Sequence, residues 1–142
     1  MKRVNTIIIA LALVIATIGT KADPRTSKQR LTIPNAVKGF QEAFVNGKIK
    51  GFSELLDDNV KFTITRGDKV ITYTKDETLE NLRKSANTVQ NCETSHEIVE
   101  SLPNQTVVKF SMKYENFTKE NYITLTESDS GWKITHVSTS FK

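Results

Sequence analysis

Apolar residues recur at helical spacing early in the chain and alternate with polar residues in most of the remainder. Val37, Phe40 and Phe44 lie three and four positions apart, as they would on one face of an α-helix. Pro34 suits the first helical turn, because its missing N–H would have no partner there in any case. Gly47 suits the residue after a helix end. The pattern therefore predicts a first helix that starts near Pro34 and ends before Gly47.

The next segment predicts a short helix and then a β-hairpin. Residues 52–56 place Phe and Leu on one side of a short helix. Apolar and polar residues then alternate over 60–65 and again over 70–74, with Gly67 in the turn between them. Period-two alternation on both sides of a glycine turn is typical of a hairpin.

A third helix is predicted directly after the hairpin. Thr74 and Glu77 have the spacing of a capping box, in which each side chain binds a free backbone N–H of the first turn. The apolar face that follows is formed by Leu79, Leu82, Ala86 and Val89.

From Cys92 onward the chain predicts four long strands, over 92–102, 106–115, 119–127 and 131–141. Short links between long strands indicate antiparallel neighbours. The element order is thus α-α-β-β-α-β-β-β-β, and the fold class is α+β. We expect a cone-shaped roll, in which a curved, mostly antiparallel sheet wraps around the first helix and leaves a hollow between them.

The N-terminal segment has the pattern of a secretory signal peptide. A basic start with Lys2 and Arg3 precedes an uncharged apolar run over 7–18, and Ala22 offers a small residue at a cleavage point. A membrane anchor needs roughly 20 apolar residues, and this run is shorter. We therefore expect a signal peptide over 1–22 and no stable membrane anchor after its cleavage. The mature protein would be exported, either to a periplasm or to the medium.

The expected mature chain begins with a polar segment over 23–31, which predicts a flexible N-terminus. One domain over 32–142 follows, and its length is sufficient for a core without disulfides. Without the leader, 17 of the 20 Lys and Arg residues remain against 16 Asp and Glu residues. This near-neutral balance argues against nucleic acid as a partner.

The single cysteine, Cys92, excludes an internal disulfide and is expected to act as a small buried hydrophobe. It also makes a poor metal ligand beside His96, because four residues along a strand span about 13 Å. We expect no metal and no cofactor. The tripeptides that begin at Asn104 and Asn116 match the glycosylation pattern, which matters only in a eukaryotic secretory pathway.

Three local patterns, in this order and spacing, resemble the nuclear transport factor 2-like superfamily. They are Phe40-Gln41-Glu42-Ala43-Phe44 with Asn46-Gly47, then Leu55-Leu56-Asp57-Asp58-Asn59-Val60, then Trp132-Lys133-Ile134. The superfamily includes SnoaL-like polyketide cyclases, ketosteroid isomerases and scytalone dehydratase. The resemblance spans 32–141 and implies a nuclear transport factor 2-like domain, a cone with a pocket between the first helix and the concave sheet.

The resemblance implies little support for ketosteroid isomerase chemistry. That branch has an oxyanion-stabilising Tyr on its first helix, where this chain has Phe40, and an Asp base in its first strand, where this chain has Thr63. Phe has no proton to donate to an oxyanion, and Thr is no base near neutral pH.

The two histidines are the candidate catalytic residues. His136 has the same strand parity as Trp132 and Ile134, so all three are expected on one face of the sheet. A His among apolar residues titrates near neutral pH and can act as a general acid or base. Resemblance to the dehydratase branch implies a partner acid, for which Asp129 in the preceding turn and Glu115 near a strand end are the candidates. His96 is the second candidate.

Aromatic residues are the better guide to a ligand site, because an apolar cavity with a few polar tips is the usual form of such a site. The expected ligand-binding residues are Phe40, Phe62, Tyr73, Phe110, Tyr114, Trp132 and His136.

The sequence leaves three functions open. The first is an exported domain that binds a small apolar or amphipathic molecule in the cone. The second is a dehydratase, cyclase or isomerase that uses a pocket His as its general acid or base. The third is an interaction module that forms a homodimer through the sheet, whose threonine-rich strands would suit a flat polar surface. The sequence names neither a ligand nor a reaction, and whether the protein is an enzyme stays uncertain.

Overall fold

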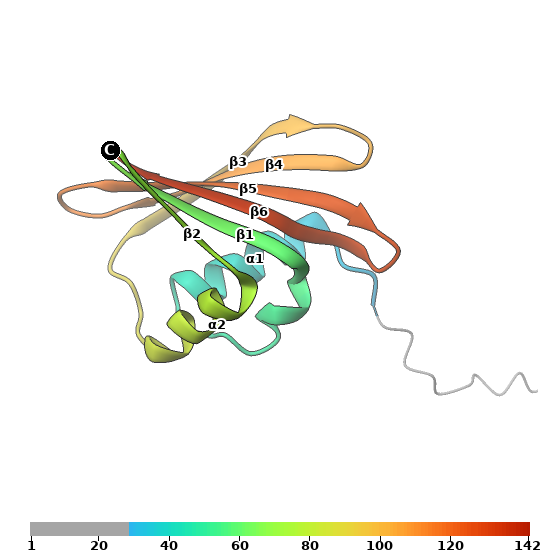
Figure 1. The fold of residues 1–142 in the computed structure, drawn as a ribbon, viewed down its shortest axis with the longest axis horizontal. Helices are drawn as coiled ribbons and strands as arrows, with labels where there is room; N and C mark the ends of the chain where they lie inside the picture. The colour runs from blue at the N-terminus through green and yellow to red at the C-terminus, as the bar shows by residue number, and fades with distance from the viewer. Residues whose placement is uncertain (1–28) are drawn as a thin grey trace, which may run out of the picture.

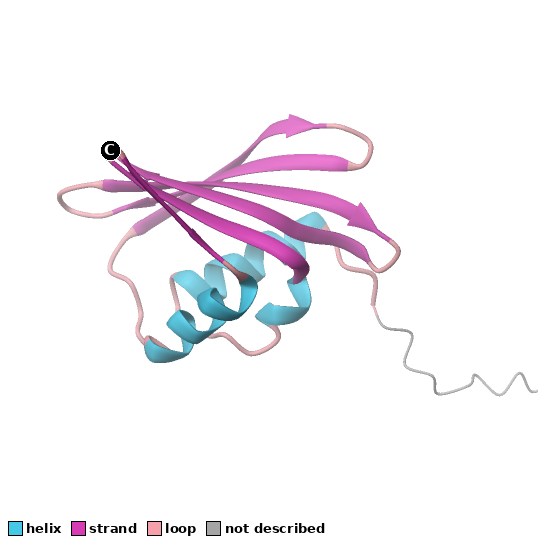
Figure 2. Cartoon of the chain, viewed as in Figure 1, coloured by secondary structure: helices cyan, strands magenta, loops and turns pink. Residues whose placement is uncertain are grey.

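The computed structural model of the protein describes residues 29–142. The predicted signal peptide over 1–22 and most of the polar segment over 23–31 lie outside the described residues. Within them, two α-helices and one short 3₁₀-helix pack on a single six-stranded sheet (Figure 2). Among residues 29–142, no helix is long and apolar enough to cross a membrane.

The elements follow the order that the sequence predicts, with a 3₁₀-helix in the second position. They are α1 (Ile33–Phe44), η1 (Phe52–Leu55), β1 (Leu56–Arg66), β2 (Lys69–Tyr73), α2 (Lys75–Lys84), β3 (Glu93–Ser101), β4 (Gln105–Lys113), β5 (Thr118–Ser128) and β6 (Gly131–Phe141). The predicted α+β cone is therefore confirmed.

The six strands lie in the order β2-β1-β6-β5-β4-β3. Strands β1 and β6 are parallel, and the other neighbours are antiparallel, so the sheet is mostly antiparallel as predicted. The sheet twists and curves, and both helices lie on one face of it (Figure 1). We call this the concave face and the opposite one the convex face.

Helix α1 starts at a side-chain cap and buries one stripe. The Thr32 hydroxyl accepts a hydrogen bond from the backbone N–H of Asn35 at 3.3 Å, which satisfies a donor that the first turn leaves free. The stripe facing the sheet consists of Ala36, Val37, Phe40 and Ala43, all buried. These residues recur at three- and four-residue spacing, so the sequence pattern predicted the buried face as well as the helix.

Helix α2 has the predicted capping box between Thr74 and Glu77. It ends at Lys84, earlier than the apolar spacing indicates, and leaves Val89 69% exposed beyond it. The chain turns at Asn87, which has a φ of 64° and donates its backbone N–H to the carbonyl of Gly47 at 2.9 Å. This contact with the segment after α1 ends the helix, although the apolar period continues.

Strand β6 contains a β-bulge, and this overturns one prediction. Thr124 of β5 pairs with His136, whereas the next residue, Leu125, pairs with Ile134, so Thr135 is an extra residue without its own partner. One extra residue reverses the side-chain alternation beyond it. The prediction that His136 shares a face with Trp132 and Ile134 is therefore wrong, since His136 lies on the convex face.

Aromatic rings join α1 to the concave face. The Phe40 ring is fully buried, and its centroid lies 5.3 Å from the Phe110 ring of β4 and 4.4 Å from the Phe44 ring. Aromatic pairs at these separations add to the free energy that area burial supplies. This cluster fixes the helix across the middle of the sheet.

The start of β6 is held by the segment before α1. The backbone N–H of Leu31 donates to Ser130 at 3.0 Å, and Trp132 donates to the carbonyl of Leu31 at 2.9 Å. Gly131 lies between these bonds with a φ of 107°, and a Cβ there would collide with the Leu31 backbone.

We expect Gly131→Ala to lower the free energy of unfolding by about 3 kcal/mol, because it combines a strained φ with a backbone collision. Gly67 is the matched control, since it also has a positive φ of 57° but open space around it. Gly67→Ala should cost only about 1 kcal/mol. Urea unfolding of the two variants measures the difference, and equal losses would contradict the close approach of Leu31.

Candidate functional site

A cavity of about 220 Å³ lies between the two helices and the concave face of the sheet. Its walls come from α1, α2, β1, β2, β5 and β6. The apolar part of the wall is formed by Phe40, Phe44, Phe62, Ile64, Leu82 and Val137. The polar part is formed by Tyr73, Thr78, Asn81, Ser85, Lys119, Asn121 and Thr139. An apolar hollow with a few polar groups has the usual composition of a small-molecule site.

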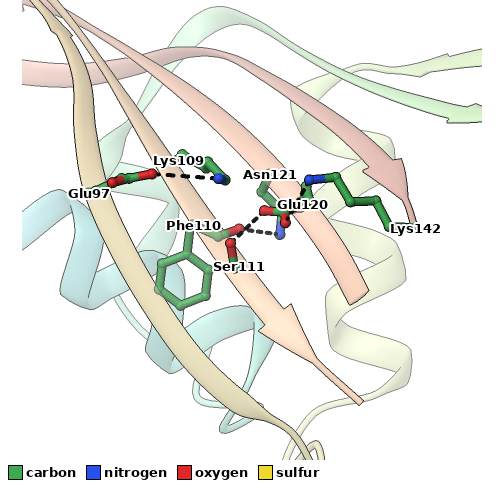
Figure 3. A network of polar contacts seen from close by, with 7 residues as sticks. All are labelled: Glu97, Lys109, Phe110, Ser111, Glu120, Asn121 and Lys142. Atoms are coloured by element: carbon green, nitrogen blue, oxygen red, sulfur yellow. Dashed lines mark hydrogen bonds and ion pairs between the residues drawn. The ribbon is translucent and has the colours of Figure 1, made fainter. Parts of the chain in front are cut away.

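Two of the polar groups are fixed by the sheet. The Asn121 amide donates to the carbonyl of Phe110 at 3.1 Å (Figure 3), and its oxygen accepts from the Thr139 hydroxyl at 2.8 Å. Both residues are buried. Because these groups satisfy each other, they form a rigid polar wall and need no ligand to stay in place.

Thr78 differs from them, because its hydroxyl has no hydrogen-bond partner. It lies on α2, is 7% exposed and lines the cavity. Among residues 29–142, its Oγ1 is the only buried side-chain nitrogen or oxygen without such a partner. A buried hydroxyl without a partner destabilises the fold by its lost hydration.

Lys119 places an amine in the cavity wall. It lies on β5, and its Nζ is 5.6 Å from the centroid of the Phe44 ring. Burial lowers the pKa of Lys119, and the positive charge of Arg66 lowers it further, against a small opposing contribution from Cys92. The amine is thus held where its charged form is less favoured than in water.

Three of the sequence-predicted ligand residues, Phe40, Phe62 and Tyr73, line this cavity. Phe110 packs against Phe40 and has no exposed surface, and its side chain does not line the cavity. Trp132 lies near the start of β6, where Leu31 is bound, and is also not part of the cavity wall.

Tyr114 lies just after β4 and outside the cavity wall. Its hydroxyl donates to Gln90 at 3.0 Å, and its ring stacks on Phe117 at 4.6 Å.

Burial, with the neighbouring Cys92 thiol, raises the pKa of Tyr114 to about 12. Burial also raises the pKa of the Cys92 thiol, so this cysteine lacks the thiolate character of a nucleophile.

Neither histidine lines the cavity. His136 faces the convex side, where its Nε2 lies 3.2 Å from the Thr63 hydroxyl. His96 is exposed on the edge strand β3, and its ring stacks on Phe110 with centroids 6.3 Å apart. Strands β5 and β4 separate the two histidines, so they do not meet.

Among residues 29–142, no three His, Cys, Asp or Glu side chains gather as a metal site would require.

Sequence reasoning missed Lys119, Thr78 and Asn121 as cavity residues. A signal was present on β5, where Lys119 and Asn121 share the parity of the apolar residues Ile123 and Leu125. Strand alternation alone would have placed their side chains on the buried face. Thr78 gave no such signal, because a polar residue in the first turn of a helix is usually solvated.

The convex face carries a polar network and no helix covers it (Figure 1). Glu120, which is 5% exposed, accepts a hydrogen bond from Ser111 and pairs with Lys142 at 3.4 Å (Figure 3). Burial alone would raise the pKa of Glu120, but the Ser111 hydrogen bond and the Lys142 charge outweigh it and hold the pKa below 4.5.

The threonines expected on a flat polar surface divide between the two faces. Thr126 and Thr135 join their hydroxyls at 3.0 Å, and Thr63 lies beside Thr72 at 3.5 Å, all on the convex side. Thr139 is buried on the concave side.

No protein-family model matches the chain, and no curated protein is significantly similar to it in sequence. Solved structures do match. A nuclear transport factor 2-like protein from Cytophaga hutchinsonii superposes with a TM-score of 0.60 at 20% identity, covering 76% of this chain and 93% of that one. A nuclear transport factor 2-like protein of unknown function in nutrient uptake from Rhodospirillum rubrum gives 0.60 at 20% identity, covering 78% and 98%.

A proposed ketosteroid isomerase from Parabacteroides distasonis superposes with a TM-score of 0.57 at 16% identity, covering 81% of this chain and 96% of that one. The chain therefore has the nuclear transport factor 2-like fold, as its sequence patterns predict. Likeness at such identities concerns the fold alone, because this fold carries many unrelated functions.

We expect Thr78→Val to raise the free energy of unfolding by about 1 kcal/mol in the ligand-free protein, because it removes a buried hydroxyl without a partner at almost constant shape. Thr78→Ser is the control, since it keeps the hydroxyl and loses a methyl group. Chemical unfolding of the three proteins measures the order, and a Val variant less stable than the parent would show that the hydroxyl is satisfied.

We expect Glu120→Gln to lower the free energy of unfolding at pH 7 by about 2 kcal/mol, because it removes a charged hydrogen-bond acceptor. A lowered native pKa stabilises the fold above the unfolded pKa, and this contribution disappears as the pH falls through the native value. The difference between variant and parent should therefore shrink below about pH 4.

Glu97→Gln is the matched control in the same network. The Glu97–Lys109 pair spans 3.5 Å, and the Glu97 side chain is 66% exposed, so its loss should change stability by less than about 0.5 kcal/mol. Urea unfolding across the pH range tests both variants. A difference for Glu120→Gln that stays constant with pH would contradict the charge-based account.

Proposed function

We propose that the protein binds a small amphipathic organic molecule in the cavity between α1, α2 and the concave face of the sheet. The observation that carries this proposal is the composition of the wall, in which six apolar side chains surround a few polar groups. Binding sites for small molecules combine these features, since the apolar area supplies affinity and the polar groups fix orientation.

The cavity volume limits the size of the ligand. An apolar cavity of about 150 Å³ is sufficient for benzene, and this one measures about 220 Å³. One aromatic ring, or a branched alkyl group of similar size, with a short polar substituent would fill it. A steroid or another fused-ring molecule would not fit without movement of α2.

Binding is favoured over acid–base catalysis by the composition of the cavity wall. The described wall residues include no His, Asp or Glu. Thr63, which aligns with the Asp base of the isomerases, lies on the convex side, and its neighbours Phe62 and Ile64 face inward. A one-residue shift of that alignment would therefore still place an apolar side chain in the cavity.

We also propose that this binding takes place outside the cytoplasm. Support comes from the sequence of residues 1–22, with its basic start, uncharged apolar run and small residue at the cleavage point. An N-terminal sequence of purified mature protein that begins at Asp23 is the expected result, and a retained Met1 would contradict export by cleavage.

Filling the cavity should weaken the binding of a small molecule. Ile64→Trp puts a large ring into the wall, and we expect it to weaken the binding of 3-phenylpropan-1-ol by about tenfold or more, a loss of about 1.4 kcal/mol. Isothermal titration calorimetry measures the affinity. Native mass spectrometry of protein purified from its own host would add the identity of any retained molecule.

Ile71→Trp is the matched control. Ile71 lies directly opposite Ile64 on β2, faces the same side of the sheet, is 45% exposed and does not line the cavity. This variant should bind the probe as the parent does. The proposal is wrong if Ile64→Trp binds as tightly as the parent, or if neither the probe nor a retained molecule binds at all.

A further inference from the structure

We propose that the cavity selects ligands that carry a carboxylate, and that Lys119 is the residue that binds this group. The inference rests on the proposed function of the cavity as a ligand site and names the chemical class of its ligand.

The position of Lys119 is the first argument. It lies on β5 between Met112 of β4 and Phe141 of β6, on the concave face. Lys119 lines the cavity, and its Nζ lies 5.6 Å from the centroid of the Phe44 ring. A ligand whose ring contacts the apolar wall would therefore have an amine within the same cavity.

The missing counter-ion is the second argument. Among residues 29–142, the side-chain amine of Lys119 forms no ion pair with a carboxylate and no hydrogen bond. Two of the other three half-buried lysines in this range are partnered, and the third, Lys133, is not. Lys75, whose side chain is 18% exposed, pairs with Asp58 at 3.0 Å, and Lys109, at 26%, pairs with Glu97 at 3.5 Å. Burial disfavours the charged form of Lys119, and an anionic ligand would favour it through an ion pair that the described residues do not provide.

The charge around the cavity mouth is the third argument. Arg66 is the nearest cation that acts on Lys119, and its guanidinium lies 4.9 Å from the centre of the Phe141 ring. No carboxylate of the described residues acts on Lys119 in this way. Arg66 is exposed and does not line the cavity, but its charge adds to that of Lys119, and neighbouring positive charges attract anions.

A carboxylate fits better than a phosphate. Phosphate sites in proteins gather several donors, such as a bidentate Arg, a helix N-terminus or a run of backbone N–H groups. The cavity offers one cation, Lys119, and no Arg among its described wall residues, and its other donors are neutral, such as the hydroxyls of Thr78 and Tyr73. These groups can stabilise a single negative charge, whereas a doubly charged group would lose more hydration than they replace.

The test compares two probes of equal shape and different charge, 3-phenylpropionate and 3-phenylpropan-1-ol, by isothermal titration calorimetry at pH 7. The parent should bind the carboxylate about tenfold to a hundredfold more tightly than the alcohol, the range expected for a hydrogen-bonded charge pair. Lys119→Met should remove this preference, so that the two probes bind to the variant with similar affinity.

Lys113→Met is the matched control, because Lys113 is exposed at the same end of the sheet on the convex side. It should keep the full preference, and Lys119→Arg should keep part of it. Equal affinity of the parent for both probes would overturn the inference and leave the cavity as an apolar binding site. A preference that survives in Lys119→Met would overturn the role of Lys119. Failure of both probes to bind would overturn the proposed function together with the inference.

Discussion

The contact between Phe40 and the concave face is the interaction on which the rest of the structure depends. The ring fills the space between α1 and the sheet, against Phe110 below and Phe44 beside it. Because α1 ends only one turn later, the sheet beyond Phe44 has no helix of the same kind to fill its curvature. Helix α2 covers that region from the side and leaves a hollow. The cavity thus follows from a short helix on a long curved sheet.

The β-bulge at Thr135 decides which side chains face this hollow. Before the bulge, Ile134 is buried on the concave face, and after it the same face is formed by Val137 and Thr139. A regular strand would have turned His136 inward and given the cavity an imidazole. With the extra residue, His136 lies beside Thr63 on the outside. One backbone irregularity therefore keeps the imidazole of His136 out of the cavity.

The elements could be predicted from sequence because each depends on local features. Helix α2 begins at a capping box that involves only Thr74 and Glu77, and β4 forms where apolar and polar residues alternate within nine residues. Both signals are local, so they can be recognised in the sequence. The end of α2 could not be predicted, because the hydrogen bond from Asn87 to Gly47 joins segments far apart in sequence. The bulge left a weak signal, because two polar residues separate Ile134 from Val137 and so interrupt the alternation, but this spacing does not show on which face His136 lies. Aromatic content found three cavity residues but overlooked the lysine among them.

Two polar groups without partners in one cavity say more about the function than the aromatic residues do. Elsewhere among residues 29–142 the buried side-chain polar atoms are hydrogen-bonded, as those of Asn121 and Thr139 are. Aromatic residues would fill a core whether or not a ligand exists. By contrast, the buried Thr78 hydroxyl lowers the stability of the fold, and burial disfavours the charged form of Lys119. A molecule with an acceptor group that reached both would stabilise the fold by mass action, and for this reason the two residues support the proposed binding more strongly than the aromatic residues do.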